Sequence, residues 1–306
     1  MEILRLNEKS NGEKAICLGL FDSMHQGHLA VFSHTLSLAS RMGIIPACFT
    51  LTGNVKGGNV YAEEERFRFI QNTGVSSCIT APFSQKLQSL SGEEFLNILV
   101  NNHSARAFII GEDYRYGKNA AWNVTHLNKF AKARGIAVDV LPDVLYGGEK
   151  ISTGRIKKIL LNGEIRTANT LLGRPYSVMG KVMEGRHVGR TMGFPTANLS
   201  VSEQTFLKPG VYATACVING SFYPAITNVG TAPTFGCEKT LIETYIQGFS
   251  GDLYGKNLRV YFIDFLREIK TFSSVEELKK QIDQDKITAQ THALEGVKAR
   301  VLEIEQ

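Results

Sequence analysis

The feature of this sequence that most limits its possible folds is a single change of hydrophobic pattern near residue 170. From residue 15 to about 162, short apolar runs rich in β-branched residues alternate with segments of helical period. From about residue 176 the helical period stops, and apolar stretches follow one another between Gly, Pro and Asn turns. The first pattern predicts a parallel sheet flanked by helices, and the second predicts an antiparallel barrel or sandwich.

We therefore expect two domains, residues 1–170 of class α/β and residues 171–306 of class all-β. The 306 residues are enough for each domain to bury its own core. The segment after residue 272 has a serine cap, early acidic residues and helical spacing, which predicts a terminal helix or two. No apolar run approaches the length of a membrane span, and the N-terminus lacks the apolar stretch of a signal peptide, so we expect a cytoplasmic protein that does not contact membrane.

Cysteine usage and charge narrow the possible partners. The five cysteines are odd in number and far apart, so a disulfide framework or a zinc site is not expected. The basic residues behind the net charge of +5 are dispersed along the chain. This charge is weak evidence for binding to nucleic acid and comparable evidence for binding to an anionic small molecule. The cysteines are Cys17, Cys48, Cys78, Cys216 and Cys237.

The stretch DSMHQGH, residues 22–28, lies between an apolar strand candidate and a helical segment. Ligands bind at the carboxyl ends of parallel strands, and a helix N-terminus suits phosphate. Gly27 would let a phosphate approach closely, while His25 and His28 can donate hydrogen bonds to its oxygens. The alternatives are a surface turn with two unrelated histidines, or a metal pair, which the absence of a nearby third ligand disfavours.

The segment GKVMEGRHVGRTMGF, residues 180–194, predicts a second phosphate-binding loop. Gly185, Gly189 and Gly193 recur at four-residue spacing with Arg190 among them. Evenly spaced glycines could form a helix-packing stripe, but the basic residues and the exposed backbone favour phosphate. The sequence contains no Walker motif, so ATP would not be held by a P-loop of that kind.

Directly after this segment, PTAN carries two oxygen-bearing side chains. Thr196 and Asn198 are two residues apart, so on an extended segment they point to one face. Hydroxyl and amide oxygens are hard ligands that suit magnesium bound to nucleotide phosphates. The alternative is a plain β-turn with a capping Thr and a turn Asn.

These stretches together resemble the bacterial bifunctional riboflavin kinase and FAD synthetase family from residue 15 to about 290. DSMHQGH is similar to the motif of the HxGH nucleotidyltransferases, FIIGEDYRYGKNA (residues 108–120) to the family's flavin-side segment, and ISTGRIK (residues 151–157) to its Ser-Ser-Thr-x-Ile-Arg segment. GFPTAN, GVYA, NVGTAPTF, IETYI, GDLYGK and KTFSSVEELKKQIDQD stand in the family's order. The resemblance implies a Rossmann-like HxGH nucleotidyltransferase domain followed by a flavokinase β-barrel with a terminal helix.

The resemblance also implies two reactions. The barrel would transfer the γ-phosphate of ATP to riboflavin and give FMN, and the first domain would join FMN to ATP and give FAD and pyrophosphate. Riboflavin, FMN, FAD and ATP are then the expected ligands, with ATP as co-substrate and Mg²⁺ as cofactor. Nucleic acid is not expected as a partner.

Residue roles follow by the same resemblance. Glu243 would be the general base toward the riboflavin 5′-hydroxyl, Thr196 and Asn198 would hold Mg-ATP, and His25 and His28 would stabilise charge during adenylyl transfer. The alternative for Glu243 is an outward-facing strand residue. The implied flavin-binding residues are Asp113, Tyr114, Arg115 and Tyr116, and the implied nucleotide-binding residues are Gly19, Phe21, Asp22, Gly27, Ser152, Thr153, Arg155, Lys157, Gly185, Gly189, Arg190, Gly193 and Pro195.

The first domain departs from the family pattern at several positions. Ser23 replaces a glycine, residues 49–60 lack the family's Pro-His-Pro loop, and Gly154 and Lys157 replace a threonine and an arginine. Losing a hydroxyl and a bidentate guanidinium near the pyrophosphate should weaken transition-state binding. One alternative is therefore a monofunctional riboflavin kinase with a degenerate or regulatory first domain. Another is a flavin-sensing or RNA-binding regulator, which the intact Thr196, Asn198 and Glu243 disfavour.

Overall fold

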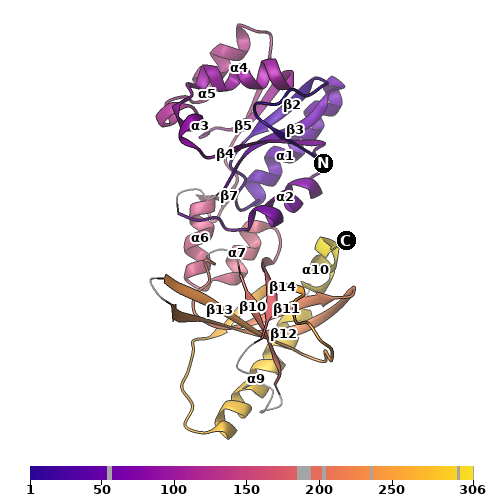
Figure 1. Ribbon diagram of the computed structural model, residues 1–306, viewed down its shortest axis with the longest axis vertical. Coiled ribbons are helices and arrows are strands. Elements are labelled where there is room, and N and C mark those ends of the chain that lie inside the picture. Colours follow the sequence, from indigo (N-terminus) through magenta and orange to yellow (C-terminus); the bar gives the residue numbers. More distant parts are fainter. Residues whose placement is uncertain (54–56, 185–193, 202–204, 235–236, 295–296, 306) are drawn as a thin grey trace. The chain divides into compact units, whose positions relative to one another are not determined.

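The computed structural model describes residues 1–53, 57–184, 194–201, 205–234, 237–294 and 297–305 (Figure 1). Contacts along the backbone divide the chain into two compact units, Met1–Ser152 and Thr153–Gln306. Residues 153–170, which the sequence assigns to the first domain, belong by these contacts to the second unit, because helix α7 (Ile165–Leu172) packs on barrel strands. Within the described ranges, no helix is both long and apolar enough to cross a membrane.

The first unit is a six-stranded sheet in the order β1-β4-β3-β2-β5-β6, and every strand pair in it is parallel. This confirms the predicted α/β class. A two-stranded hairpin follows the sheet in the chain. The strands are β1 (Glu2–Arg5), β2 (Lys14–Leu18), β3 (Ile45–Thr52), β4 (Ser77–Pro82), β5 (Ala105–Gly111), β6 (Ala137–Leu141), β7 (Leu145–Tyr146) and β8 (Glu149–Lys150); the helices are α1 (Gln26–Met42), α2 (Glu63–Asn72), α3 (Gln85–Ser89), α4 (Gly92–His103), the 3-10 turn η1 (Lys118–Ala120) and α5 (Val124–Lys132).

The strand order places a topological switch at β2. The chain leaves β2 through α1 to β3 on one side, whereas β5 pairs with the other side of β2 and is followed outward by β6. Connections therefore leave the carboxyl ends of β2 and β5 in opposite directions. Open parallel sheets bind their ligands in the crevice at such a point.

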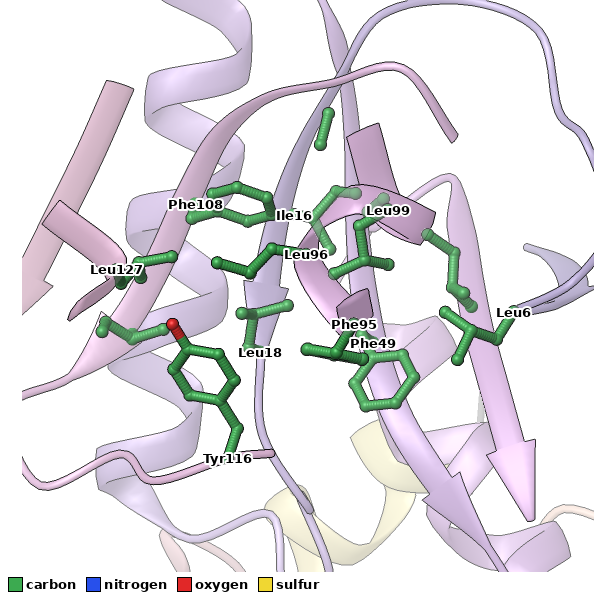
Figure 2. Packing of buried hydrophobic residues seen from close by; sticks show 14 of the residues in the cluster. Leu6, Ile16, Leu18, Phe49, Phe95, Leu96, Leu99, Phe108, Tyr116 and Leu127 are labelled. Carbon is green, nitrogen blue, oxygen red and sulfur yellow. The ribbon is translucent and has the colours of Figure 1, made fainter. Parts of the chain in front are cut away.

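Both faces of the sheet are covered. Successive side chains of β2 point to opposite faces, and all five residues of β2 are buried. Ile16 and Leu18 face a cluster of apolar residues that includes Phe95 and Leu99 of α4 and Leu127 of α5 (Figure 2). Cys17 points to the opposite face, where Thr35 of α1 lies against it, and burial raises the pKa of its thiol to about 12. Cys48 and Cys78 continue this row across β3 and β4, and all three thiols are free.

The second unit is a closed barrel of six strands in the order β10-β13-β12-β11-β14-β9, with all strand pairs described antiparallel. Two helices precede it in the chain and two follow it, which confirms the predicted barrel with terminal helices. The strands are β9 (Tyr176–Met183), β10 (Thr196–Ser200), β11 (Gly210–Ile218), β12 (Ser221–Thr234), β13 (Cys237–Ile246) and β14 (Asn257–Arg267); the helices are α6 (Thr153–Leu161), α7 (Ile165–Leu172), α9 (Val275–Leu294) and α10 (Val297–Glu305).

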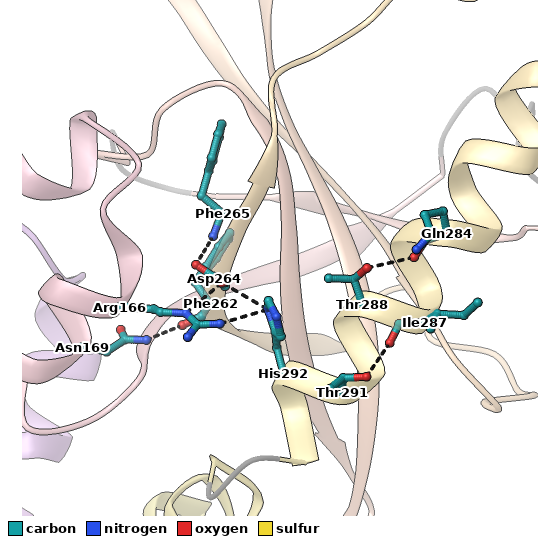
Figure 3. A network of polar contacts seen from close by, with 10 residues as sticks. All are labelled: Arg166, Asn169, Phe262, Asp264, Phe265, Gln284, Ile287, Thr288, Thr291 and His292. Carbon is teal, nitrogen blue, oxygen red and sulfur yellow. Dashed lines mark hydrogen bonds and ion pairs between the residues drawn. The ribbon is translucent and has the colours of Figure 1, made fainter.

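The terminal helices pack on the outer wall of the barrel. Ala289 of α9 and Val301 of α10 are fully buried in one cluster with Ile226 of β12 and residues of β11 and β14. Asp264 of β14 anchors two helices at once, because it accepts a hydrogen bond from Arg166 of α7 at 2.8 Å and pairs with His292 of α9 at 3.1 Å (Figure 3). Helices thus cover the barrel wall over parts of β11, β12 and β14.

Candidate active sites

In the first unit, the turn between β2 and α1 has an unusual backbone. Phe21 and Met24 both have positive φ, 48° and 46°, a region that residues with side chains rarely adopt. A β-carbon at Gly19 would lie 2.6 Å from carbons of the Phe21 ring, so only glycine fits there. Such strain is concentrated at functional sites, and this turn lies at the carboxyl end of β2.

The two histidines of this turn are held in a fixed geometry. His25 caps α1, and its Nδ1 accepts a hydrogen bond from the backbone N–H of His28 at 3.1 Å. The two rings stack with their centres 3.7 Å apart. Because Nδ1 is an acceptor, the neutral His25 ring carries its proton on Nε2. A β-carbon at Gly27 would lie 3.1 Å from the His25 ring, so a larger residue there would crowd the ring out of its position.

Side chains from β3 and α2 fix the end of β2. The carbonyl of Leu20 accepts hydrogen bonds from Thr50 Oγ1 at 2.7 Å and from Arg66 Nη1 at 3.3 Å. Arg66 is 1% exposed, and its Nη2 also bonds the Leu51 carbonyl at 2.5 Å. Sequence reasoning missed Arg66, although a basic residue on the apolar side of a helix is a signal that could have identified it. Asp22, also buried, accepts from the backbone N–H of Val60 at 2.9 Å.

A cavity of about 370 Å³ opens at the same edge of the sheet, at the ends of β2, β3 and β5. Three of the four predicted flavin-binding residues, Tyr114, Arg115 and Tyr116, line it. The rest of the lining is mostly apolar. It includes Gly19, Leu20, Phe49, Leu51, Phe83, Leu87, Leu90 and Phe95.

Asp113, the fourth of these residues, does not line the cavity but forms an ion pair with Lys150 of β8. Lys150 also lies 2.7 Å from Asp143. Partial burial lowers the pKa of Lys150, but the hydrogen bonds and charges of Asp113 and Asp143 outweigh it and raise that pKa above 10.5. Sequence reasoning missed Lys150, which directly precedes the ISTGR segment.

The ISTGR segment crosses from one unit to the other, with Ser152 in the first and Thr153 at the start of α6 in the second. A β-carbon at Gly154 would meet nothing within 4 Å, so this position has room for a side chain. The Lys157 ammonium lies 4.8 Å from the centre of the Phe206 ring. Arg155 lies on the first turn of α6.

In the second unit, the strand register brings three polar residues into one row. Asn198 of β10 lies directly opposite Glu243 of β13, and Glu243 lies directly opposite Asn228 of β12. Opposed residues of antiparallel strands point to the same face, and the flanking Ile242 and Thr244 are buried. The row therefore faces outward from the barrel, and all three side chains are half-buried. Sequence reasoning missed Asn228, which only the register places beside Glu243.

Thr196 begins the neighbouring row. It lies opposite Tyr245, whose ring packs edge-on against Phe194 with centres 5.5 Å apart. The amide nitrogen of Asn198 points toward the Thr196 carbonyl at 3.5 Å, which leaves the amide oxygen of Asn198 for another partner. The ammonium of Lys286, from α9, lies over both the Phe194 and the Tyr245 rings.

A cavity of about 620 Å³ is lined by Thr196 but not by Asn198, Glu243 or Asn228. Ala197, Thr244 and Ile246, which alternate with these residues along β10 and β13 and so face the other side of the strands, also line it. Pro195 and Thr196 lie on one side of it, and residues 249–254, which include the motif GDLY, lie on another. The predicted phosphate-loop residues Gly185, Gly189, Arg190 and Gly193 lie outside the described residues.

Comparison with known families separates the chain into the same two parts. The family model for FAD synthetase matches residues 7–155, and the family model for riboflavin kinase matches residues 172–293.

Relatives match along almost the whole length. A bifunctional riboflavin kinase/FMN adenylyltransferase of Listeria monocytogenes is 32% identical, over 91% of this chain and 92% of the relative. One of Buchnera aphidicola subsp. Acyrthosiphon pisum is 31% identical, over 92% and 94%. The chain belongs to the bifunctional riboflavin kinase/FMN adenylyltransferase family. A crystal structure titled as a macrolide-efflux protein from Streptococcus pneumoniae matches it with a TM-score of 0.87 and 26% identity, over 95% of this chain and 99% of that one.

The family expected from the sequence is thus confirmed, and so is the bifunctional enzyme. A monofunctional riboflavin kinase is not favoured, because the FAD synthetase model matches the first unit as the riboflavin kinase model matches the second. The strained turn with His25 and His28 lies in the FMN adenylyltransferase part, and the row of Asn198 and Glu243 lies in the riboflavin kinase part. The roles of individual residues remain predictions.

Proposed function

We propose that this bifunctional riboflavin kinase/FMN adenylyltransferase performs its two reactions at two separate sites. The barrel phosphorylates riboflavin to FMN, and the α/β unit adenylylates FMN to FAD with release of pyrophosphate. The observation that carries the kinase assignment is the register of β10 and β13, which sets a carboxylate directly opposite an amide on the outer, half-buried face of the barrel wall.

In the kinase reaction, Glu243 accepts the proton of the riboflavin 5′-hydroxyl as that oxygen attacks the γ-phosphorus of ATP. The bond from the γ-phosphorus to the β,γ-bridging oxygen breaks, and ADP leaves. Phosphoryl transfer needs mainly positioning and charge neutralisation, with one carboxylate in reach of the attacking hydroxyl. The cavity of residues 249–254 adjoins Thr196 and holds the nucleotide.

The kinase site fits magnesium through oxygen donors. Thr196 offers a hydroxyl, and Asn198 offers the amide oxygen that its contact with Thr196 leaves available. Mg²⁺ in nucleotide sites takes one or two protein oxygens together with phosphate oxygens and water. When bound, it would neutralise charge on the transferred phosphate. In the described ranges, no group of three or more His, Cys, Asp or Glu side chains is arranged to hold a metal.

In the adenylyltransferase reaction, a phosphate oxygen of FMN attacks the α-phosphorus of ATP and pyrophosphate leaves, with no covalent enzyme intermediate. The first N–H groups of α1, the Nε2–H of His25 and the ring of His28 stabilise charge on the α-phosphate. Gly27 allows close approach. The family resemblance assigns the departing phosphates to the ISTGR segment, of which Ser152 belongs to this unit.

The cavity of about 370 Å³ in the α/β unit receives the isoalloxazine ring. Its walls of Phe, Leu and Tyr side chains match a flat and largely apolar ring. Its position beside Gly19 would leave the phosphate of FMN near the start of α1. We also place the enzyme in the cytoplasm, where its substrate ATP is made.

Incubating the protein with riboflavin and Mg-ATP, followed by separation of the flavins, tests this function. Formation of both FMN and FAD is expected. FMN alone would favour a degenerate or regulatory first unit, and unchanged riboflavin would favour a flavin-sensing regulator.

A further inference from the structure

Helix α9 brings a cation to the edge of the proposed kinase site. The Nζ of Lys286 lies 5.4 Å from the centre of the Phe194 ring and 5.9 Å from that of the Tyr245 ring. Phe194 comes two residues before Thr196 in the chain, and Tyr245 lies directly opposite Thr196 across the strands. The β-carbons of such an opposed pair are roughly 5 Å apart. The ammonium therefore lies on the outer face of the strands near Thr196, the residue proposed above to hold Mg-ATP.

Neighbouring groups fix the position of the Lys286 ammonium beside the two rings, but its positive charge is only weakly paired. Attraction to the faces of two aromatic rings orients the ammonium. Gln247 of the barrel donates a hydrogen bond to the Lys286 carbonyl at 3.2 Å, which fixes this turn of α9 on the wall. The ammonium pairs with Asp283 at 3.1 Å, but the carboxylate of Asp283 is 59% exposed. Exposed pairs of this kind are weak, so a phosphate can replace the carboxylate.

The chemistry of the reaction calls for such a group. Phosphoryl transfer is catalysed mainly by positive charge placed on the oxygens of the transferred and leaving phosphates. Lysine supplies a compact point charge on a flexible chain, which suits a phosphate that changes position during transfer. We propose that Lys286 binds the β- and γ-phosphates of ATP in the riboflavin kinase reaction. This inference rests on the kinase site proposed above.

The test compares three variants of the full-length enzyme. Lys286→Met keeps the apolar stem but removes the charge, and Lys286→Arg keeps the charge. Lys280→Met is the matched control, an exposed lysine six residues earlier and roughly 120° around the same helix. Initial rates of riboflavin phosphorylation are measured with Mg-ATP varied and then with riboflavin varied. Inhibition constants are measured for ADP and for AMP.

Because it loses a charged hydrogen bond, Lys286→Met should have a KM for Mg-ATP roughly ten- to hundredfold higher than the parent. Its KM for riboflavin should stay within about twofold of the parental value. ADP should inhibit this variant less than the parent, whereas AMP, which lacks the β- and γ-phosphates, should inhibit both equally. Lys286→Arg should recover most of the loss, and Lys280→Met should match the parent. FAD formation from supplied FMN should be unchanged throughout.

Unchanged kinetics in Lys286→Met would overturn the proposal. So would an equal rise in both KM values, or a loss that arginine does not restore while the melting temperature falls, because these results indicate a packing role. Asn198→Ala is measured in parallel to separate this inference from the assignment of the site. If Asn198→Ala weakens the use of Mg-ATP and Lys286→Met does not, the site stands and the role of Lys286 fails; if neither variant has an effect, the site itself is misplaced.

Discussion

Asn198 and Glu243 lie directly opposite each other on the antiparallel strands β10 and β13, and both face away from the barrel interior. Opposed side chains on one face are within contact distance of each other. An amide that can bind a cation and a carboxylate that can accept a proton are therefore brought together by strands about 45 residues apart in the chain. This pairing carries the first two of the following predictions.

Glu243→Gln should reduce riboflavin phosphorylation by roughly a hundredfold or more, because the amide cannot accept the hydroxyl proton. The side chain keeps its size, so the fold should persist. The measurement is the initial rate of FMN formation at saturating riboflavin and Mg-ATP, with FAD formation from supplied FMN as the internal control. Unaltered turnover in this variant would make Glu243 an ordinary strand residue.

Asn198→Ala and Thr196→Ala should each weaken the use of Mg-ATP at the kinase site more than they weaken riboflavin binding, because each removes an oxygen ligand. Titrating magnesium at fixed ATP should show a higher requirement in both variants. Ser200→Ala is the control, since Ser200 lies on the same face of β10 two residues beyond Asn198. Magnesium dependence like that of the parent would indicate that Thr196 and Asn198 only shape the strand.

His28→Ala should abolish FAD formation from FMN and leave riboflavin phosphorylation intact, because His28 lies in the first unit and the kinase row lies in the second. Its backbone N–H can still bond His25 Nδ1, so the cap of α1 survives and the loss reports the ring itself. Both rates are measured on the same preparation. FAD formation at the parental rate would exclude a role for this ring.

The departures from the family pattern at Gly154 and Lys157 predict slow FAD synthesis by the parent protein, so a variant with the family residues restored serves as a control. Gly154→Thr combined with Lys157→Arg returns the hydroxyl and the bidentate guanidinium of the family pattern and should raise the adenylylation rate. The structure favours the first change, because a β-carbon at position 154 meets open space. Absence of FAD from both parent and restored variant, with FMN still produced, would contradict the adenylyltransferase assignment.

Tyr116→Phe should stabilise the protein by about 1 kcal/mol. The Tyr116 hydroxyl is buried and has no hydrogen-bond partner among the described residues, and burial also raises its pKa. Figure 2 shows the oxygen directed into the apolar cluster on the side of Leu127. Urea unfolding should give a higher midpoint for this variant. Tyr212→Phe should instead lower it, because the Tyr212 hydroxyl donates to the Lys208 carbonyl.

Stability should fall as the pH drops below about 6.5, in part through His103. His103 is fully buried, with Nε2 3.0 Å from the Leu6 carbonyl and Nδ1 2.9 Å from Ser10 Oγ. Burial lowers its pKa below the ordinary 6.5 and outweighs the hydrogen bond to Leu6, which acts in the opposite direction. The unfolded chain therefore binds a proton that the folded chain does not, and the free energy of unfolding decreases from pH 6.5 down to the folded pKa.

Urea midpoints measured between about pH 7.5 and pH 5.5 check this expectation. His103→Gln keeps a donor and an acceptor but cannot titrate, so it should show a smaller decrease over the same range. An identical decrease in the variant would assign the effect to other groups.

Much of the architecture is present in local sequence patterns. Alternating β-branched and helical segments predicted the parallel sheet, and closely spaced strands between turns predicted the barrel. HQGH could be placed at a strand end because an apolar run precedes it and a helical period follows. These signals are local, since side chains that repeat every two or every 3.6 residues show their buried face within a single element.

Other features depend on which strands become neighbours. The four-residue β1 has no strong pattern of its own, and it forms because its backbone pairs with β4. Without the neighbouring motifs, the sequence around Glu243 favours an outward-facing strand residue over a general base, and only the register shows which polar residues surround it. Arg66, Asn228 and Lys286 escaped notice because each matters only through a partner distant in the chain. Local sequence patterns by themselves determined most of the strands and helices, and the motifs indicated the family. The tertiary structure decided the neighbours, because strand order and register are chosen by packing of the whole core rather than by any segment.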